Sequence, residues 1–274
     1  MIEYTRPSIF VLEILLKLMP ISNEFFLRMC FTRSQNRIQI YIKINLIYCD
    51  ATLSTTVKML IIFDVEGVLL NAEYLPVLAQ KLGPVKEKEI WDITKQGIRG
   101  EIDWEEGLIM RVNALRGTSF EDAKYIADNL EIMPGARKLC YSLKKAGWKM
   151  IAISGGFTII TDKLKDELYL DKIYSNELIF KDGKLDGVKI NVSSDKSLGV
   201  KSIIKEWGIK KEDIVVVVDG ANDLKLFDIA GYTVGFCPVD IVKQRADATI
   251  EIRDLSILLS LLEKKFGKTI ETQL

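Results

Sequence analysis

Two strongly apolar runs, each followed by an acidic residue, constrain the fold of this chain more than any other feature. Leu60–Phe63 (LIIF) leads into Asp64 and Glu66, and Asp213–Val218 (DIVVVV) leads into Asp219. Runs of this kind are typical of strands buried on both faces of a parallel sheet. A carboxylate at the end of such a strand is costly to desolvate without a partner. Its presence there indicates a ligand site at the carboxyl edge of the sheet.

Strands and helices alternate over the second half of the chain. Apolar runs predict further strands at Lys149–Ile153, Tyr232–Phe236 and Ala248–Ile252. Asp182-Gly183, within residues 177–186, predicts a hairpin. Spacings of three and four between apolar residues predict helices at residues 136–146, 157–168, 195–207 and 255–266. This order favours right-handed βαβ units, so the sequence predicts an α/β fold with a doubly wound parallel sheet.

Residues 71–130 interrupt this alternation. Helical periodicity recurs, without a candidate strand, at Tyr74–Leu82, Lys86–Gln96, Trp104–Leu115 and Glu121–Leu130. A block of helices directly after the first strand is typical of a small inserted domain. We therefore predict a core domain of residues 59–70 and 131–274, with a helical cap domain at 71–130 inserted into it.

Residues 1–58 differ in character from the rest. Ile9–Ile21 is apolar enough for a helix, but two charges interrupt it and it is too short to span a bilayer. Arg33–Ile47 mixes basic and β-branched residues without a clear period, and Met59 directly precedes the first buried strand. We expect residues 1–58 to be an N-terminal extension outside the fold, with the functional protein starting near Met59. The alternative is a helix that binds a membrane surface or a partner.

Charge and composition narrow the range of partners. Lysine plus arginine and aspartate plus glutamate each number 38, so the formal net charge is zero. This balance argues against nucleic-acid and membrane binding, which need a basic excess. The chain has no histidine, which excludes a Ser-His-Asp triad and zinc sites with imidazole ligands. The scattered cysteines, Cys30, Cys49, Cys140 and Cys237, are expected of reduced thiols in a cytoplasmic protein.

Polar clusters follow three of the predicted strands: Asp64-x-Glu66, Ser154-Gly155-Gly156 and Asp219-Gly-x-x-Asp223. Parallel strands bring these clusters to one edge of the sheet, where the carboxylates need a cation between them. Carboxylate oxygens and water suit Mg²⁺. Ser154 and the glycines are expected to open a helix whose free N–H groups bind an anion. A cation, an anion pocket and a nucleophilic carboxylate suggest phosphoryl transfer through an aspartyl-phosphate.

The segments FDVEGV (63–68), ISGGF (153–157), Lys196 and VDGAND (218–223), in this order, resemble the haloacid dehalogenase (HAD) superfamily of phosphatases. Within it the chain is most similar to the phosphoserine phosphatases. The resemblance covers residues 59 to about 265, including the helical insertion in the cap position and the KDGKLDG hairpin (181–187). It implies a Mg²⁺-dependent phosphomonoesterase whose small phosphorylated substrate is O-phosphoserine, hydrolysed to serine and phosphate in L-serine biosynthesis.

The resemblance also implies roles for individual residues. Asp64 matches the nucleophile, and Glu66 stands where the family has the aspartate that acts as general acid and base. Lys196, with Lys201 as the alternative, matches the lysine that neutralises the phosphate and Asp64. The implied metal ligands are Asp64, Glu66 through its backbone carbonyl, Asp219 and, through bound water, Asp223. The implied phosphate-binding residues are Ser154, Gly155, Lys196 and Asn222.

The helical insertion carries the residues that would recognise the substrate. By the same resemblance, Glu73 matches the glutamate that binds the serine ammonium, and Arg111 matches the arginine that pairs with the serine carboxylate. Trp104 and Ile98 stand at cap positions that would cover the substrate and exclude water. The alternative is that Glu73 and Arg111 are ordinary solvated charges on helix faces.

Glu66 leaves the activity open between several alternatives. Its extra methylene departs from the usual aspartate but matches the DLEGV and DIEGT patterns of phosphoserine-dependent phosphotransferases and enolase-phosphatases in the superfamily. The alternatives to a phosphoserine phosphatase are transfer of the phosphoryl group to another alcohol such as homoserine, hydrolysis of another small phosphometabolite, and a phosphometabolite-binding module with little turnover. The sequence leaves the oligomeric state unknown.

Overall fold

The computed structural model describes residues 29–34, 37–42 and 59–267. The chain divides into two units, Met1–Ser54 and Thr55–Leu274. In the first unit, β1 (Met29–Ser34) and β2 (Arg37–Ile42) pair as an antiparallel two-stranded sheet. The sequence did not predict this pairing, because its basic residues blur the alternation of a strand. The helix expected at Ile9–Ile21 lies outside the described residues.

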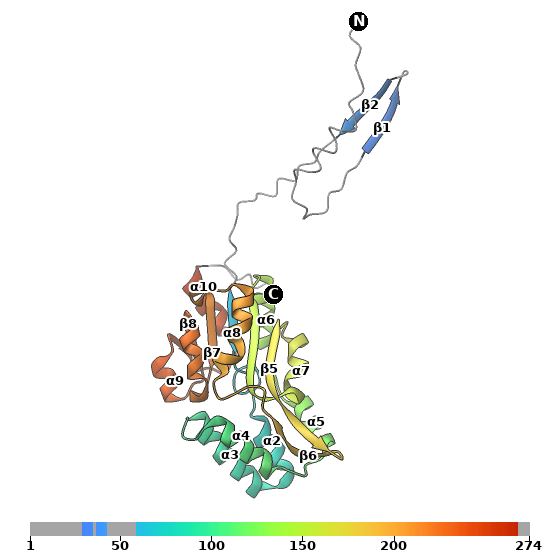
Figure 1. The fold of residues 1–274 in the computed structure, drawn as a ribbon. Helices are drawn as coiled ribbons and strands as arrows, with labels where there is room; N and C mark the ends of the chain where they lie inside the picture. Colours follow the sequence, from blue (N-terminus) through green and yellow to red (C-terminus); the bar gives the residue numbers. More distant parts are fainter. Residues whose placement is uncertain (1–28, 35–36, 43–58, 268–274) are drawn as a thin grey trace. The chain divides into compact units, whose positions relative to one another are not determined.

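A seven-stranded sheet forms the centre of the second unit (Figure 1). Its strands are β3 (Leu60–Phe63), β4 (Lys149–Phe157), β5 (Lys172–Lys181), β6 (Lys184–Lys189), β7 (Ile214–Val218), β8 (Tyr232–Phe236) and β9 (Ala248–Ile250). They lie in the order β6-β5-β4-β3-β7-β8-β9, and every neighbouring pair is parallel except β5 and β6. This arrangement confirms the predicted α/β class, with β3 at the centre.

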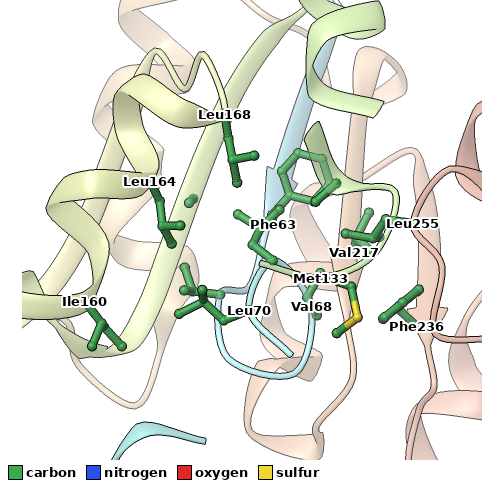
Figure 2. Close-up of a cluster of buried hydrophobic side chains, with 14 of the residues drawn as sticks. Phe63, Val68, Leu70, Met133, Ile160, Leu164, Leu168, Val217, Phe236 and Leu255 are labelled. Carbon is green, nitrogen blue, oxygen red and sulfur yellow. The ribbon is translucent and has the colours of Figure 1, made fainter. Parts of the chain in front are cut away.

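Helices cover both faces of this sheet. They are α6 (Ala136–Lys145), α7 (Thr158–Glu167), α8 (Lys196–Trp207), α9 (Asp240–Arg245) and α10 (Ile257–Phe266), with 3₁₀ segments η2 (Lys211–Asp213) and η3 (Ala221–Ile229). Ile61 and Phe63 of β3 pack in one core cluster with side chains of α6, α7 and α10. Figure 2 shows Phe63 in this cluster with Leu164 of α7. Leu60 and Ile62 pack in a second cluster with α8, η3 and α9. All four β3 side chains are fully buried, which confirms that this strand is covered on both faces.

The helical insertion lies between β3 and α6. It comprises α2 (Tyr74–Ala79), η1 (Gln80–Leu82), α3 (Pro84–Ile98), α4 (Trp104–Ala114) and α5 (Phe120–Asn129). The four predicted helices are confirmed, each to within two or three residues at its ends. Asp103 caps α4 by accepting hydrogen bonds at Oδ1 from the N–H groups of Glu105 and Glu106. This cap fixes the start of α4, where Trp104 stands. Within the described ranges, no helix is long and apolar enough to cross a membrane.

The predicted hairpin is formed by β5 and β6, with Asp182 and Gly183 at its turn. Their φ angles are 50° and 73°, positive at both positions as a type I′ turn requires. The hairpin also bonds to the helical insertion. Gly117 N–H donates to the Leu185 carbonyl and Leu185 N–H donates to the Thr118 carbonyl, both at 2.8 Å. The edge of the sheet is therefore tied by backbone hydrogen bonds to the segment between α4 and α5.

Candidate active site

The carboxyl ends of β3, β4 and β7 meet at one edge of the sheet, as predicted. Phe63 pairs with Ala152 of β4 and with Val217 of β7, and the next N–H, that of Asp64, donates to the Val217 carbonyl at 3.0 Å. A cavity of about 10 Å³ lies at this edge. The side chains and backbone that line this cavity were all predicted for the site. They belong to Asp64, Glu66, Glu73, Ile98, Trp104, Ser154, Gly155, Lys196, Asp219 and Asn222. The structure thus brings together residues from five separate segments of the sequence.

Lys196 is the buried cation of the site. Its Nζ atom lies 2.6 Å from Asp64 Oδ1 and 2.7 Å from Asp223 Oδ1, and its side chain is 3% exposed. Burial disfavours the ammonium, but the two carboxylates outweigh that effect and raise the pKa of Lys196. Lys201, one turn further along α8, is exposed. The geometry therefore favours Lys196 over Lys201 for the predicted role.

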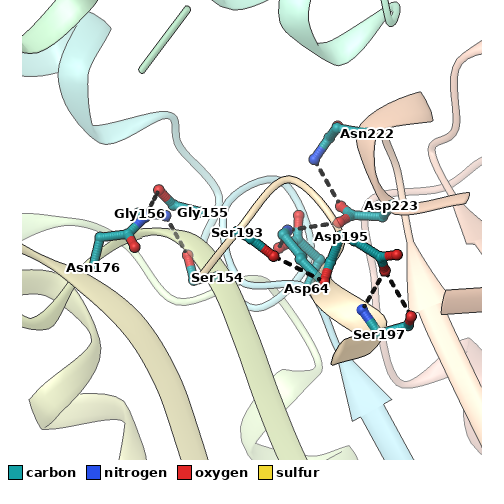
Figure 3. A network of polar contacts seen from close by, with 11 residues as sticks. Asp64, Ser154, Gly155, Gly156, Asn176, Ser193, Asp195, Ser197, Asn222 and Asp223 are labelled. Carbon is teal, nitrogen blue, oxygen red and sulfur yellow. Dashed lines mark hydrogen bonds and ion pairs between the residues drawn. The ribbon is translucent and has the colours of Figure 1, made fainter. Parts of the chain in front are cut away.

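Local hydrogen bonds fix Lys196 as the first residue of α8. Asp195, the N-cap residue, accepts the Ser197 N–H at Oδ1, 3.1 Å away (Figure 3). On the opposite side, Asn222 Nδ2 donates to Asp223 Oδ2 at 3.1 Å. The ammonium and the Asp223 carboxylate are thus both held by neighbours from their own segments.

Three carboxylates gather beside this lysine. Asp64, Asp219 and Asp223 each offer an oxygen within 4.8 Å of the others. Burial, together with the charge of Asp64, raises the pKa of Asp219 to about 7 and that of Asp223 well above its usual range. Carboxylate oxygens this close together suit a hard metal ion, which would offset their repulsion. The cluster could therefore hold a metal ion; the Glu66 carboxyl does not belong to this cluster.

Gly67 lets the chain pass close to this cluster. Its φ angle is +79°, and a Cβ at this position would lie 2.1 Å from Asp219 Oδ2. Both the positive φ and the close approach require a residue without a side chain. The glycine after Glu66 thus allows the Asp64 loop and Asp219 to lie against each other.

The extra methylene of Glu66 is accommodated by folding its carboxyl back toward the helical insertion. Glu66 Oε1 accepts the N–H of Tyr74, the first residue of α2, at 2.6 Å. A Cβ on Gly156 would lie 2.3 Å from Glu66 Oε2, so the other oxygen sits against that glycine. Burial raises the pKa of Glu66 to about 7, against the opposing influence of the Tyr74 N–H and Arg111. A carboxyl with such a pKa can both donate and accept a proton near neutral pH.

Ser154 and the two following glycines do not open a helix, so that prediction was wrong. They belong to β4, and α7 begins only at Thr158. The pairing of β4 with β5 shifts register between Ile153 and Phe157, an irregularity that turns this segment toward the cavity. Ser154 Oγ accepts the Gly156 N–H at 2.9 Å (Figure 3). An anion here would meet a bulged strand end and not a helix N-terminus.

Asn176 organises the site and was missed by the sequence analysis. Its Nδ2 donates to the Gly155 carbonyl at 2.9 Å (Figure 3). Its Oδ1 accepts the N–H groups of Asn191 at 2.8 Å and Val192 at 2.9 Å. The side chain is fully buried. Asn176 therefore ties the Ser154–Gly156 segment to the loop that leads to Lys196. The signal that could have revealed it is an amide side chain within β5, where an apolar residue is expected.

The two residues predicted to recognise the substrate, Glu73 and Arg111, lie on the helical insertion. Glu73 lines the cavity, and burial, followed by the charges of Glu66 and Asp219, raises its pKa. Arg111 is 3% exposed and is not among the lining residues. Its Nε donates to the Gly107 carbonyl at 3.0 Å and its Nη1 to Thr94 Oγ1 at 3.1 Å. A buried guanidinium is not a solvated surface charge, so the alternative reading of Arg111 was wrong.

Trp104 lines the cavity and also contacts Arg111. The Arg111 guanidinium carbon lies 4.5 Å from the centroid of the Trp104 ring, a cation–π contact. Trp104 and Ile98 both line the cavity. Its volume of about 10 Å³ leaves room for roughly one water molecule. That the two side chains cover a bound substrate stays a prediction.

The chain is similar in sequence to known phosphatases. The family model of haloacid dehalogenase-like hydrolases matches residues 58–231. A phosphoserine phosphatase of Methanocaldococcus jannaschii is 37% identical over 209 residues, which cover 75% of this chain and 98% of that protein. The phosphoserine phosphatase of Archaeoglobus fulgidus is also 37% identical over 209 residues, but this match spans only 60% of its length.

Solved structures of phosphoserine phosphatases are similar to this chain in fold as well as in sequence. A phosphoserine phosphatase captured as an analogue of its phospho-aspartyl intermediate superposes with a TM-score of 0.72 at 37% identity, covering 74% of this chain and 98% of that one. A substrate-bound phosphoserine phosphatase gives a TM-score of 0.71 at 36% identity with the same coverage. The chain therefore belongs to the haloacid dehalogenase-like hydrolases, and within them it is an enzyme of the phosphatase type.

Proposed function

We propose that this enzyme is a Mg²⁺-dependent phosphoserine phosphatase that works through an aspartyl-phosphate on Asp64. The observation that carries the proposal is the Asp64 carboxylate at the cavity, 2.6 Å from the buried Lys196 ammonium and within reach of two further aspartates. The names of the relatives support phosphoserine as the substrate. Such an activity would supply L-serine in the cytoplasm.

In the proposed reaction, an oxygen of Asp64 attacks phosphorus and the bond from phosphorus to the serine oxygen breaks. Glu66 donates its proton to the departing alkoxide. Glu66 then accepts a proton from water, whose oxygen attacks the phosphorus of the aspartyl-phosphate, and the bond from Asp64 to phosphorus breaks. Lys196 offsets the negative charge on Asp64 and on the phosphoryl group. Mg²⁺, when bound by the aspartates, would lower the electrostatic cost of bringing the two anions together.

Recognition of serine is assigned in this proposal to Glu73 and Arg111, and phosphate binding to Ser154, Gly155, Lys196 and Asn222. Residues 71–130 act as the cap. A cavity of about 10 Å³ is too small for phosphoserine, so the start of α4 and the end of α3 must move to admit it. Trp104 and Ile98 then close over the bound substrate.

The proposal is tested by measuring phosphate release from a panel of phosphomonoesters. The full chain would be assayed with O-phospho-L-serine, O-phosphothreonine, O-phosphoethanolamine, phosphoglycolate and glucose 6-phosphate, each with Mg²⁺ and with EDTA. We expect the highest kcat/KM with phosphoserine and no turnover in EDTA. Preference for phosphoglycolate or the sugar phosphate would refute phosphoserine as the substrate. Full activity in EDTA would refute the dependence on Mg²⁺.

Transfer of the phosphoryl group to a second alcohol is the alternative, because Glu66 stands where the DLEGV pattern of phosphoserine-dependent phosphotransferases has its glutamate. Turnover of phosphoserine in the presence of homoserine, followed by ³¹P NMR, separates the two reactions. We expect inorganic phosphate as the only product, and a new phosphoester signal would favour transfer. A wild-type enzyme that is almost inactive and is activated by Glu66→Asp would instead indicate a phosphometabolite-binding module.

A further inference from the structure

One hydrogen-bond donor at the cavity has no partner. Trp104 Nε1 is buried, and its N–H finds no hydrogen-bond acceptor among the described residues. A buried N–H without an acceptor loses its hydrogen bonds to water and gains nothing in exchange. Such a group in a native site needs an explanation, and a bound ligand that offers an acceptor supplies one.

The position of the indole is set from three sides. A Cβ on Gly97 of α3 would lie 2.9 Å from Trp104 Cε3, and a Cβ on Gly155 would lie 2.1 Å from Trp104 Nε1. The Arg111 guanidinium covers the ring at 4.5 Å. The six-membered ring thus packs against Gly97, and the N–H edge lies against Gly155. The donor is held in one place by glycines that leave room for it.

That place is the anion end of the cavity. Gly155 follows Ser154, and both line the cavity together with Lys196 and Asp64. A side chain needed only to cover the substrate would serve equally well without an N–H group.

We propose that the Trp104 indole N–H donates a hydrogen bond to a phosphoryl oxygen of the bound substrate. The inference rests on the proposed function, because a phosphomonoester is the ligand. The helical insertion then contributes to phosphate binding as well as covering the site. Closure without a ligand leaves this donor unpaired, whereas closure over a phosphoryl group provides its acceptor, so the phosphoryl group itself favours the closed form.

Trp104→Phe removes the N–H and keeps an aromatic ring between Gly97 and Arg111. The full chain with Mg²⁺ would be inhibited with orthovanadate, a phosphoryl mimic, and separately with L-serine. We expect inhibition by orthovanadate to weaken about tenfold, as for loss of a hydrogen bond to a charged acceptor, while inhibition by L-serine is unchanged. Trp91→Phe, outside the cavity, is the matched control and should behave as wild type. An unchanged orthovanadate constant in Trp104→Phe would overturn the inference.

A second measurement follows ligand binding in the wild-type chain and uses Trp104→Phe only to assign the Trp104 signal. The four tryptophans give four indole N–H signals in a ¹⁵N spectrum, and the signal lost in Trp104→Phe identifies Trp104. Addition of Mg²⁺ and orthovanadate should move that signal downfield more than the other three; no movement would overturn the inference. If orthovanadate does not inhibit wild type and no phosphomonoester is hydrolysed, the proposed function fails instead.

Discussion

The two halves of the active site are built on different principles. On the strand-end half, the charges meet one another directly: Lys196 lies within 2.7 Å of carboxylate oxygens on both Asp64 and Asp223. On the helical half, Arg111 bonds within the insertion, and Trp104 presents a donor with no partner. In the first half, Lys196 is already paired with two carboxylates before a phosphomonoester arrives. The second is completed by the ligand, so substitutions in the two halves should have different kinetic signatures.

The largest effect is expected from Asp64→Asn, which removes the proposed nucleophile. The kcat for phosphoserine should fall by about 10⁴-fold or more, as for loss of other covalent nucleophiles. The fold should persist, because Lys196 keeps its ion pair with Asp223 at 2.7 Å. Steady-state kinetics and thermal melting check both statements, with the exposed Asp228→Asn as control. A loss smaller than tenfold would show that the strand-end half does not supply the nucleophile.

Gly156→Ala tests whether the position of Glu66 matters. The added Cβ would lie 2.3 Å from Glu66 Oε2, so the carboxyl must shift, and misplacement of a reacting group by about 1 Å can cost about 10²-fold in rate. We expect kcat to fall between about 10- and 100-fold. Gly187→Ala, whose Cβ would meet nothing within 4 Å, is the control. Adding Glu66→Asp should restore part of the rate, and a double variant slower than Gly156→Ala would contradict this explanation.

Arg111→Lys tests the helical half of the site by comparing two substrates, one with a carboxylate and one without. The lysine keeps the charge but cannot form the paired hydrogen bonds of a guanidinium. The KM for phosphoserine should rise about tenfold, whereas O-phosphoethanolamine, which lacks the carboxylate, should be little affected. The control is Arg116→Lys, at a surface ion pair with Asp186. Equal losses with both substrates would mean that Arg111 acts through its contact with Trp104 instead of reading a carboxylate.

The smallest effect on activity is expected from Asp171→Asn, at the amino-terminal end of the sheet. Burial alone would raise the pKa of Asp171, but the Met150 N–H and the ammonium groups of Lys149 and Lys144 outweigh it and lower that pKa. Its stabilising contribution is therefore present above the unfolded-state pKa and is lost as the pH falls through the folded-state pKa.

We expect Asp171→Asn to lower the free energy of unfolding by about 1 kcal/mol at neutral pH. The difference from wild type should shrink below about pH 4, while kcat at pH 7 is unchanged. Urea denaturation at several pH values measures this, with the exposed Asp166→Asn as control. A difference that does not shrink as the pH falls would show that the ionised carboxylate is not its source.

The sequence predicted the strand-end half well for a topological reason. Adjacent parallel strands align their carboxyl ends, so Asp64 and Asp219 are neighbours once β3 and β7 are recognised as buried strands. Their apolar runs are unmistakable because both faces of each strand are covered. The helices of the insertion were equally visible, since each has one buried face.

Several features of the site could not be predicted from the sequence, because they depend on contacts between segments that are distant in the chain. The bulge at Ser154–Gly156 arises from pairing with β5, and the three bonds of Asn176 join segments 15 to 21 residues away. The place of Arg111 behind the indole depends on how α3, α4 and the strand ends pack together. The short helix α9 was missed because six residues are too few to show a helical period.

The hairpin of β5 and β6 gives the helical insertion a third backbone attachment, besides its two covalent links to the core. Three backbone hydrogen bonds, each 2.8 Å long, join the insertion to the hairpin. Their donors are the N–H groups of Gly117, Leu185 and Phe120. All three hydrogen bonds would have to break before the insertion could swing away as a rigid body. The start of α4 is held to the core in another way, since Ser194 Oγ donates to Asp103 Oδ2 at 2.9 Å and accepts the Glu105 N–H at 3.3 Å. We therefore expect entry of a phosphomonoester to require the breaking of these side-chain hydrogen bonds near Trp104 and not the detachment of the whole insertion.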